Sequence, residues 1–134
     1  VYGGEMSAHH YFRDFMYCDS GMIPWILLIE HMSTSGKKLS ELVADMQARF
    51  PSSGEINFKL DDKQPAIDAF EATYLAGANG VDRMDGLSLD FGEWRVNLRQ
   101  SNTEALLRLN VETRGNRALL AEKIAEISDL IVRA

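Results

Sequence analysis

Hydrophobic positions divide the chain into two parts with different patterns. Between residues 39 and 50, apolar side chains recur at intervals of three and four residues, which predicts an amphipathic helix. The apolar stripe of this helix consists of Leu39, Leu42, Val43, Met46 and Phe50. The sequence Pro51-Ser52-Ser53-Gly54 then interrupts the pattern, and we expect a domain boundary or linker there.

From residue 54 onward the pattern predicts one complete small domain of the α+β class, with the order β-α-β-β-β-β-α. Apolar and polar residues alternate in strand-like segments at residues 55–60, 80–84, 87–91, 93–99 and 106–113. Two amphipathic helices accompany them, one opening at Pro65 and one over about residues 117–132. We therefore expect a four- to five-stranded antiparallel sheet with helices on one face. The last helix should cover that face with Leu120, Ile124, Ile127 and Ile131.

The first 50 residues contain two predicted helices and one strand end, but no predicted sheet. Residues 1–4 read as the end of a strand that runs into a loop. A helix follows from about Met22, with Asp19 or Ser20 as its cap, and Gly36 ends it. The first half of this helix is apolar nearly all round, so we expect it to be buried. This part of the chain therefore looks like the helical remnant of an α/β domain whose beginning is missing.

The composition is that of a soluble globular protein, because 46% of the 134 residues are hydrophobic and 25% are charged. A net charge of −6 argues against nucleic-acid binding. The longest apolar run, residues 22–29, is too short to span a bilayer, so we expect no membrane association. A single cysteine, Cys18, excludes an intrachain disulfide and, with no signal peptide at the front, favours a cytoplasmic location.

The polar stretch of residues 99–104, with Arg108 beyond it, is the first candidate site. It lies between two alternating segments, so it reads as the tip that joins two strands. Arg99 and Arg108 can each fork onto a phosphate, and the tip between them offers hydroxyl, amide and backbone N–H groups. Residues 95–117 carry five arginines against two glutamates, a local charge of +3 that suits a small anionic ligand. The alternative is a polar hairpin turn with two solvated arginines.

The loop of residues 3–9 is the second candidate site. Glu5 and Ser7 are two residues apart, so in an extended loop their side chains point the same way and can bind neighbouring hydroxyls of a sugar. His9 titrates near neutrality and can assist proton transfer. The alternative is a connection between a strand and a helix whose polar groups are incidental.

Together these two loops resemble those of a known family. Gly4-Glu5-Met6-Ser7-Ala8-His9 resembles the sugar-binding loop of the α-D-phosphohexomutases, whose usual form is Gly-Glu-Met-Ser-Gly-His. Arg99-Gln100-Ser101-Asn102-Thr103-Glu104 resembles the phosphate-binding loop of the same family, in the same order and at a comparable separation. Residues 82–86 and 93–95 are similar to the bacterial phosphomannomutases, and Met6 and Asn102 favour the phosphomannomutase/phosphoglucomutase type over the phosphoglucosamine mutases.

The resemblance implies that residues 1–50 are the end of the family's third domain and residues 54–134 its whole fourth domain, which has a fold like that of the TATA-box-binding protein. It also implies a role for several residues. Glu5 and Ser7 would bind ring hydroxyls, and His9 would lie near the reacting end as an acid/base. The phosphate that is not transferred would be held by Arg99, Ser101, Asn102 and Thr103. Two residues depart from the family pattern, Ala8 in place of a common Gly and Ala105 in place of a common Pro.

The family transfers phosphoryl groups through a phosphoserine and a Mg²⁺ held by an Asp-rich loop, both of which belong to earlier domains. This chain has no counterpart of either, and the spacing matches no metal-binding pattern among its candidate ligands His9, His10, Cys18 and His31. We expect the parent protein to be an isomerase that interconverts mannose 6-phosphate and mannose 1-phosphate through a bisphosphorylated sugar, with glucose phosphates as further candidate substrates. The isolated chain should be inactive, since half a site cannot position the reaction.

The expected partners are a hexose phosphate and the missing N-terminal domains of the same protein. Self-association of the chain through its apolar helices is a further expectation. Two alternatives from other functional classes stay open, namely a non-catalytic module that binds sugar phosphates and a purely structural α+β module.

Overall fold

The computed structural model describes residues 1–5, 8–101 and 103–134. They form two compact units, Val1–Ala44 and Asp45–Ala134. The division falls within the helix α2 (Leu39–Arg49), which the spacing of apolar residues predicted. Among the residues described, no helix is long and apolar enough to cross a membrane.

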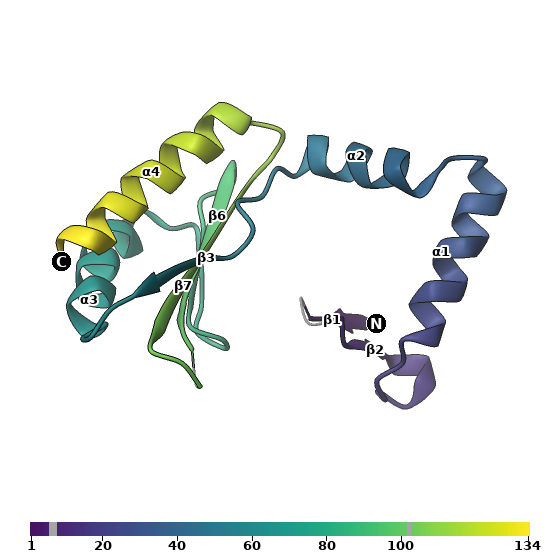
Figure 1. The fold of residues 1–134 in the computed structure, drawn as a ribbon, viewed down its shortest axis with the longest axis horizontal. Helices are drawn as coiled ribbons and strands as arrows, with labels where there is room; N and C mark the ends of the chain where they lie inside the picture. The colour runs from purple at the N-terminus through teal and green to yellow at the C-terminus, as the bar shows by residue number, and fades with distance from the viewer. Residues whose placement is uncertain (6–7, 102) are drawn as a thin grey trace. The chain divides into compact units, whose positions relative to one another are not determined.

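The second unit contains the antiparallel sheet and the two helices that were predicted from residue 54 onward (Figure 1). The strands are paired in the order β3-β7-β6-β5-β4, and every pairing is antiparallel. The elements in chain order are β3 (Ile56–Lys59), α3 (Gln64–Tyr74), the short 3-10 helix η2 (Leu75–Gly77), β4 (Gly80–Asp82), β5 (Leu87–Asp90), β6 (Trp94–Gln100), β7 (Leu106–Thr113) and α4 (Arg117–Arg133). The predicted fold class and element order are therefore confirmed.

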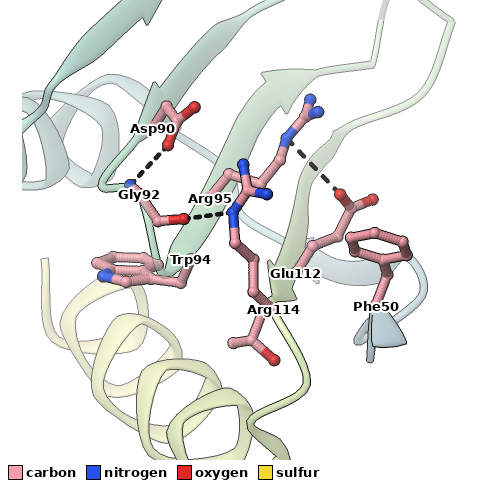
Figure 2. Close-up of a pocket in the computed structure, with 8 residues that line it drawn as sticks. Phe50, Asp90, Gly92, Trp94, Arg95, Glu112 and Arg114 are labelled. Atoms are coloured by element: carbon pink, nitrogen blue, oxygen red, sulfur yellow. Dashed lines mark hydrogen bonds and ion pairs between the residues drawn. The ribbon is translucent and has the colours of Figure 1, made fainter. Parts of the chain in front are cut away.

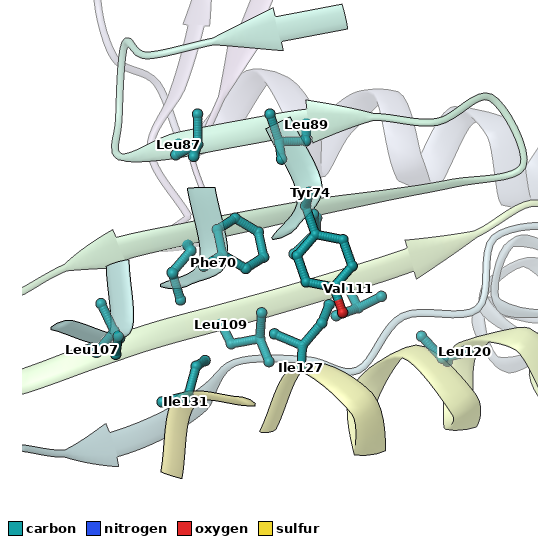
Figure 3. Close-up of a cluster of buried hydrophobic side chains, with 13 residues drawn as sticks. Phe70, Tyr74, Leu87, Leu89, Leu107, Leu109, Val111, Leu120, Ile127 and Ile131 are labelled. Carbon is teal, nitrogen blue, oxygen red and sulfur yellow. The ribbon is translucent and has the colours of Figure 1, made fainter. Parts of the chain in front are cut away.

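One face of this sheet forms the hydrophobic core with α3 and α4 (Figure 3). The strands contribute alternate residues, so that Leu107, Leu109 and Val111 of β7 are buried while the residues between them are not. The helices contribute Phe70 from α3 and Ile127 from α4, both fully buried. The buried core comprises Ala66, Phe70, Tyr74, Leu87, Leu89, Val96, Leu98, Leu107, Leu109, Val111, Leu120, Ile127 and Ile131. Because one face is committed to the core, the opposite face of the sheet carries the polar residues.

Tyr74, at the end of α3, connects the two helices. Its hydroxyl donates to Glu126 of α4 over 2.7 Å, and burial together with this hydrogen bond raises the pKa of the phenol. The same carboxylate accepts a hydrogen bond from Lys123 at 2.6 Å, which holds the pKa of Glu126 below its usual range. The Lys123 ammonium also lies 5.3 Å from the ring centre of Trp94, so the network reaches the first residue of β6.

The first unit contains a small hairpin that the sequence did not predict. Strand β1 (Tyr2–Gly4) pairs antiparallel with β2 (His10–Phe12), and the 3-10 helix η1 (Arg13–Phe15) follows. The expectation that this part has no sheet of its own is therefore wrong. Three residues per strand are too few for the alternation of apolar and polar side chains to stand out in the sequence.

Helix α1 (Met22–Ser35) begins and ends as expected, but it is not buried. Gly36 ends it with φ = 67° and donates its N–H to the Met32 carbonyl, and Ser20 caps it by accepting the Ile23 N–H at 3.3 Å. The side chain of Trp25 is 56% exposed, and no residue of α1 is buried. Burial was the wrong expectation because the sheet that the described residues of the first unit form is a two-stranded hairpin, which offers too little apolar surface to cover a helix that is hydrophobic nearly all round.

The turn between β4 and β5 depends on Gly86. Its φ is +72°, and a Cβ atom added there would lie 2.5 Å from both the Leu98 carbonyl oxygen and the Arg99 Cβ. This glycine thus lets the turn that follows Asp85 lie directly against Arg99 on β6. Asp-Gly is a sequence pair typical of tight hairpin turns, and Asp85-Gly86 lies between the paired strands β4 and β5.

We predict that Gly86→Ala destabilises the sheet unit by about 1–3 kcal/mol or more, because strain from a positive φ is joined by contact with backbone atoms. Gly54→Ala is the matched control, since Gly54 has φ = +65° with no atom within 4 Å of the added Cβ. Urea unfolding, followed through the amide signals of β6 and β7, measures the free energy of unfolding of both variants. Equal losses of stability in the two variants would contradict the close approach of Gly86 to Arg99.

Candidate functional site

The tip between β6 and β7 is built around Ser101. Its N–H donates to the Leu106 carbonyl at 2.9 Å, which closes the two strands where they meet the loop. The Ser101 hydroxyl oxygen accepts the Glu104 N–H at 3.2 Å and the Thr103 N–H at 3.4 Å. This bonding leaves the hydroxyl its own hydrogen to donate. The predicted strand-joining tip is confirmed, and the predicted residue Asn102 lies outside the described residues.

Arg99 and Arg108 face each other directly across the β6–β7 pairing. Their side chains are only 26% and 21% exposed, so the alternative of two solvated arginines is wrong. A carboxylate between them explains how two like charges are kept so close together. Glu55 Oε2 accepts from Arg99 Nη2 at 3.2 Å, and Glu55 Oε1 lies 3.5 Å from Arg108 Nε.

Two more carboxylates approach the arginines from the solvent side. Asp85 Oδ2 lies 3.7 Å from Arg99 Nη1, and Glu104 Oε2 accepts from Arg108 Nη2 at 2.9 Å. Their side chains are 75% and 57% exposed, against 17% for Glu55. One inner and two outer carboxylates therefore accompany the two guanidinium groups. The local positive charge that the sequence indicated is offset by Glu55 and Asp85, which lie outside residues 95–117.

Sequence reasoning missed Glu55. Glu55 lies just before β3 and is 44 residues from Arg99 along the chain. Strand β3 pairs with β7, with Ile56 opposite Leu109 and Asn57 opposite Arg108. Only this pairing brings Glu55 to the arginines. The sequence offers one indication of its position, because Glu55 is a polar residue two positions before Asn57 and therefore falls on the same face of the strand. Polar residues at such positions are common, so this indication is weak.

The second loop brings Glu5 and His9 together. The Glu5 N–H donates to the His9 carbonyl at 2.9 Å, and the Ala8 N–H donates to the Glu5 carbonyl at 3.1 Å. The backbone of Glu5 therefore lies beside that of His9. The Glu5 carboxylate also accepts from the Tyr11 hydroxyl at 3.0 Å, a bond that raises the pKa of the phenol. The predicted residue Ser7 lies outside the described residues.

His9 is held by a carboxylate that sequence reasoning considered only as a helix cap. Asp19 Oδ2 lies 2.7 Å from His9 Nδ1, while Asp19 Oδ1 accepts the His10 N–H at 2.8 Å. The hydrogen bond to Asp19, and then the charge of that carboxylate, raise the pKa of His9, and the same bond lowers the pKa of Asp19. A histidine bonded in this way at Nδ1 has a fixed ring orientation and directs Nε2 to any proton transfer.

Two positions of the second loop have restricted surroundings, one in its backbone conformation and one in its space. Ala8 has φ = 66°, in the left-handed region where a glycine is less strained. The family pattern has glycine at this position. At Gly4, an added Cβ would lie 2.5 Å from the Tyr2 hydroxyl, which is bonded to His10 Nδ1 at 2.6 Å. The loop therefore tolerates its alanine at a cost in strain.

A cavity of about 170 Å³ lies at the other end of the sheet (Figure 2). Its polar groups are engaged with one another. Arg114 Nε donates to the Gly92 carbonyl at 2.7 Å, and Arg95 lies 3.7 Å from Glu112. The cavity is lined by Phe50, Asp90, Gly92, Trp94, Arg95, Glu112, Thr113 and Arg114, a set that includes no predicted site residue. In the described ranges, no group of three or more His, Cys, Asp or Glu residues is placed to hold a metal ion, and the arginine tip lacks the donor set for one.

Two sequence profiles of one family match the chain in sequence order. Phosphoglucomutase/phosphomannomutase, alpha/beta/alpha domain III, matches residues 1–50, and phosphoglucomutase/phosphomannomutase, C-terminal domain, matches residues 55–130. The chain belongs to the phosphoglucomutase/phosphomannomutase family. Both candidate loops lie within the matched segments, one in each.

Curated relatives agree with this membership. The chain is 59% identical to a protein named "Phosphohexose mutases" from Xanthomonas campestris pv. campestris and 56% identical to a "Phosphomannomutase" from Salmonella montevideo, in each case over 131 residues, or 98% of this chain. A crystal structure of a phosphoglucomutase/phosphomannomutase family protein from Burkholderia thailandensis superposes with a TM-score of 0.64 at 26% identity, covering 98% of this chain and 27% of that one. The chain spans 29% of the length of these two curated relatives.

We predict that His9 titrates above its ordinary pKa of 6.5 and that Asp19→Asn lowers this value, because the variant removes the carboxylate that stabilises the imidazolium. A histidine NMR titration of the chain measures the shift. Asp14→Asn is the matched control, since the carboxylate of Asp14 bonds to Arg13 instead. An unchanged His9 titration in Asp19→Asn would contradict the assigned pairing.

Proposed function

We propose that this chain supplies the sugar-binding and phosphate-binding parts of a phosphomannomutase that interconverts mannose 6-phosphate and mannose 1-phosphate through a bisphosphorylated sugar. The observation that carries the proposal is the pair of arginines that face each other beside a hydroxyl-rich tip, in a member of this family. Glucose phosphates are candidate substrates as well. The reaction is an isomerisation, because the sugar would gain a phosphoryl group from the phosphoserine at one end and give the phosphoryl group of its other end back to the serine.

In this proposal the β6–β7 tip grips the phosphate that is not being transferred. A phosphate dianion needs several donors at once, and guanidinium groups match its geometry with two parallel N–H groups each. Arg99 and Arg108 supply the charge, and Ser101 and Thr103 supply hydroxyl donors, with Asn102 between them in the sequence. A phosphate held in this way fixes one end of the sugar while the other end reacts.

The other loop is proposed to bind the ring of the same sugar. The Glu5 carboxylate can accept hydrogen bonds from two neighbouring hydroxyls, with Ser7 as a further partner. His9, oriented through Asp19, exchanges a proton at Nε2 with the sugar hydroxyl that gains or loses the phosphoryl group. When bound in the whole enzyme, Mg²⁺ neutralises charge on the transferred phosphoryl group, and we place its ligands and the nucleophilic serine in other domains.

The proposed domain organisation follows from the same assignment. Residues 1–50 would be the end of the third domain, and residues 54–134 the fourth. The two family profiles that match residues 1–50 and 55–130 support this division. In an α/β/α domain, each helix packs one apolar side against a sheet. The exposed apolar side chains of α1 are consistent with this assignment, because the sheet of the proposed third domain would cover them.

We predict that mannose 1-phosphate shifts the amide signals of residues 99–103 when it is titrated into the chain, whereas mannose without a phosphate does not. Ser101→Ala should weaken this binding about tenfold, because it removes a donor to a charged group and an acceptor that organises the tip. Ser128→Ala, on α4, is the matched control. If millimolar mannose 1-phosphate leaves these signals in place, the chain is a structural module only.

We also predict that the 134-residue chain alone converts neither hexose phosphate into the other, since it provides binding groups but no phosphoserine. A coupled assay for mannose 6-phosphate tests this. Turnover by the chain that disappears in Ser101→Ala would overturn the proposal that this chain binds the substrate while other domains carry the reacting groups. The full coding sequence separates the remaining readings, because a protein without an upstream serine nucleophile and an acidic metal loop would be a non-catalytic sugar-phosphate module.

A further inference from the structure

Five charged side chains around the β6–β7 tip differ sharply in their exposure. Arg99, Arg108 and Glu55 are largely buried, whereas Asp85 and Glu104 are largely exposed. Exposed ion pairs are weak and are screened by salt, so an incoming anion can replace them. A carboxylate that is buried between two guanidinium groups is held much more firmly.

The register of the sheet makes a counter-ion necessary at this point. Two arginines directly opposite each other on neighbouring strands repel, and partial burial strengthens the repulsion. Glu55 contacts both, at 3.2 Å from Arg99 Nη2 and 3.5 Å from Arg108 Nε. Among the residues that the structure describes, Arg108 Nε is the one buried side-chain nitrogen or oxygen with no hydrogen-bond partner, and the nearest ionic partner recorded for it is Glu55. The Glu55 carboxylate thus meets this nitrogen as an ion pair at 3.5 Å.

We propose that Glu55 is a positioning residue of the phosphate clamp, a statement that rests on the proposed function. It holds the inner edges of the two guanidinium groups, so that their remaining N–H groups stay at a fixed separation for a phosphate. Asp85 and Glu104 occupy the outer edges when no ligand is bound and give way to it. With only Glu55 left, the two arginines carry a net charge of +1 toward the anion.

The test is phosphate binding by the intact chain, with Glu55→Gln compared against Glu104→Gln. Glu55→Gln places an amide N–H₂ where one arginine requires an acceptor, so we expect its affinity for mannose 1-phosphate to fall about tenfold or more. Glu104→Gln removes the same charge from an outer position, and we expect its affinity to stay equal or to rise. Glu55→Asp, which keeps the charge on a shorter side chain, should recover part of the loss.

A spectroscopic signal reports positioning separately from affinity. In ¹H–¹⁵N spectra of the arginine side chains, the Nε–H signal of Arg108, whose Nε lies 3.5 Å from Glu55, should exchange with water more slowly than that of Arg95, whose side chain is 60% exposed. We expect Glu55→Gln to remove this protection and Glu104→Gln to preserve it. The comparison of Arg108 with Arg95 uses the unchanged chain, so it holds even if Glu55→Gln does not fold.

The outcomes separate the two proposals. Phosphate binding by the unchanged chain together with equal or tighter binding by folded Glu55→Gln would overturn the positioning role and leave the proposed function intact, because Glu55 would then be a competitor of the anion. Exchange of the Arg108 Nε–H group as fast as that of Arg95 would also overturn it. A chain that binds neither mannose 1-phosphate nor inorganic phosphate, yet shows slow exchange that depends on Glu55, would defeat the proposed function alone.

Discussion

The pairing of β3 with β7 and of β7 with β6 is the constraint on which the rest of the sheet unit depends. It aligns Leu98 with Leu109 toward the core and Arg99 with Arg108 toward the polar face. A slip of one residue between β6 and β7 would turn one of the arginines toward the core, and a slip between β3 and β7 would turn Glu55 away from them. The core under α3 and α4 therefore fixes the register, and the register fixes the clamp.

The same constraint explains why the tip has more acidic groups than the sequence indicated. Strand β3 pairs with β7 and carries Glu55 to the two arginines, and the turn at Gly86 carries Asp85 to Arg99. Both carboxylates arrive through strand pairing and not through proximity in the sequence. A site that must hold two cations close together in the absence of a ligand needs such partners, and the sheet supplies them.

In the first unit, a carboxylate also orients the side chain of a candidate site residue, but its partners lie closer along the sequence. Asp19 bonds both to the ring of His9 and to the backbone of His10, so one carboxylate orients the imidazole and the start of β2. Backbone hydrogen bonds place Glu5 beside His9. The groups proposed for sugar binding and proton transfer are therefore held by contacts within one small hairpin and the residues that follow it.

The sequence by itself determined the class and order of elements from residue 54 onward, because alternation along β5, β6 and β7 and the stripe on α4 are local patterns. The two loop motifs likewise singled out Glu5, His9, Arg99, Ser101 and Arg108. Only the tertiary structure decided that Glu55 lies between the arginines, that Asp19 bonds to His9, that residues 10–12 form a strand and that α1 is exposed. Each of these depends on which segments come together or on how much surface remains to cover a helix, and neither quantity is encoded in the spacing of residues along one element.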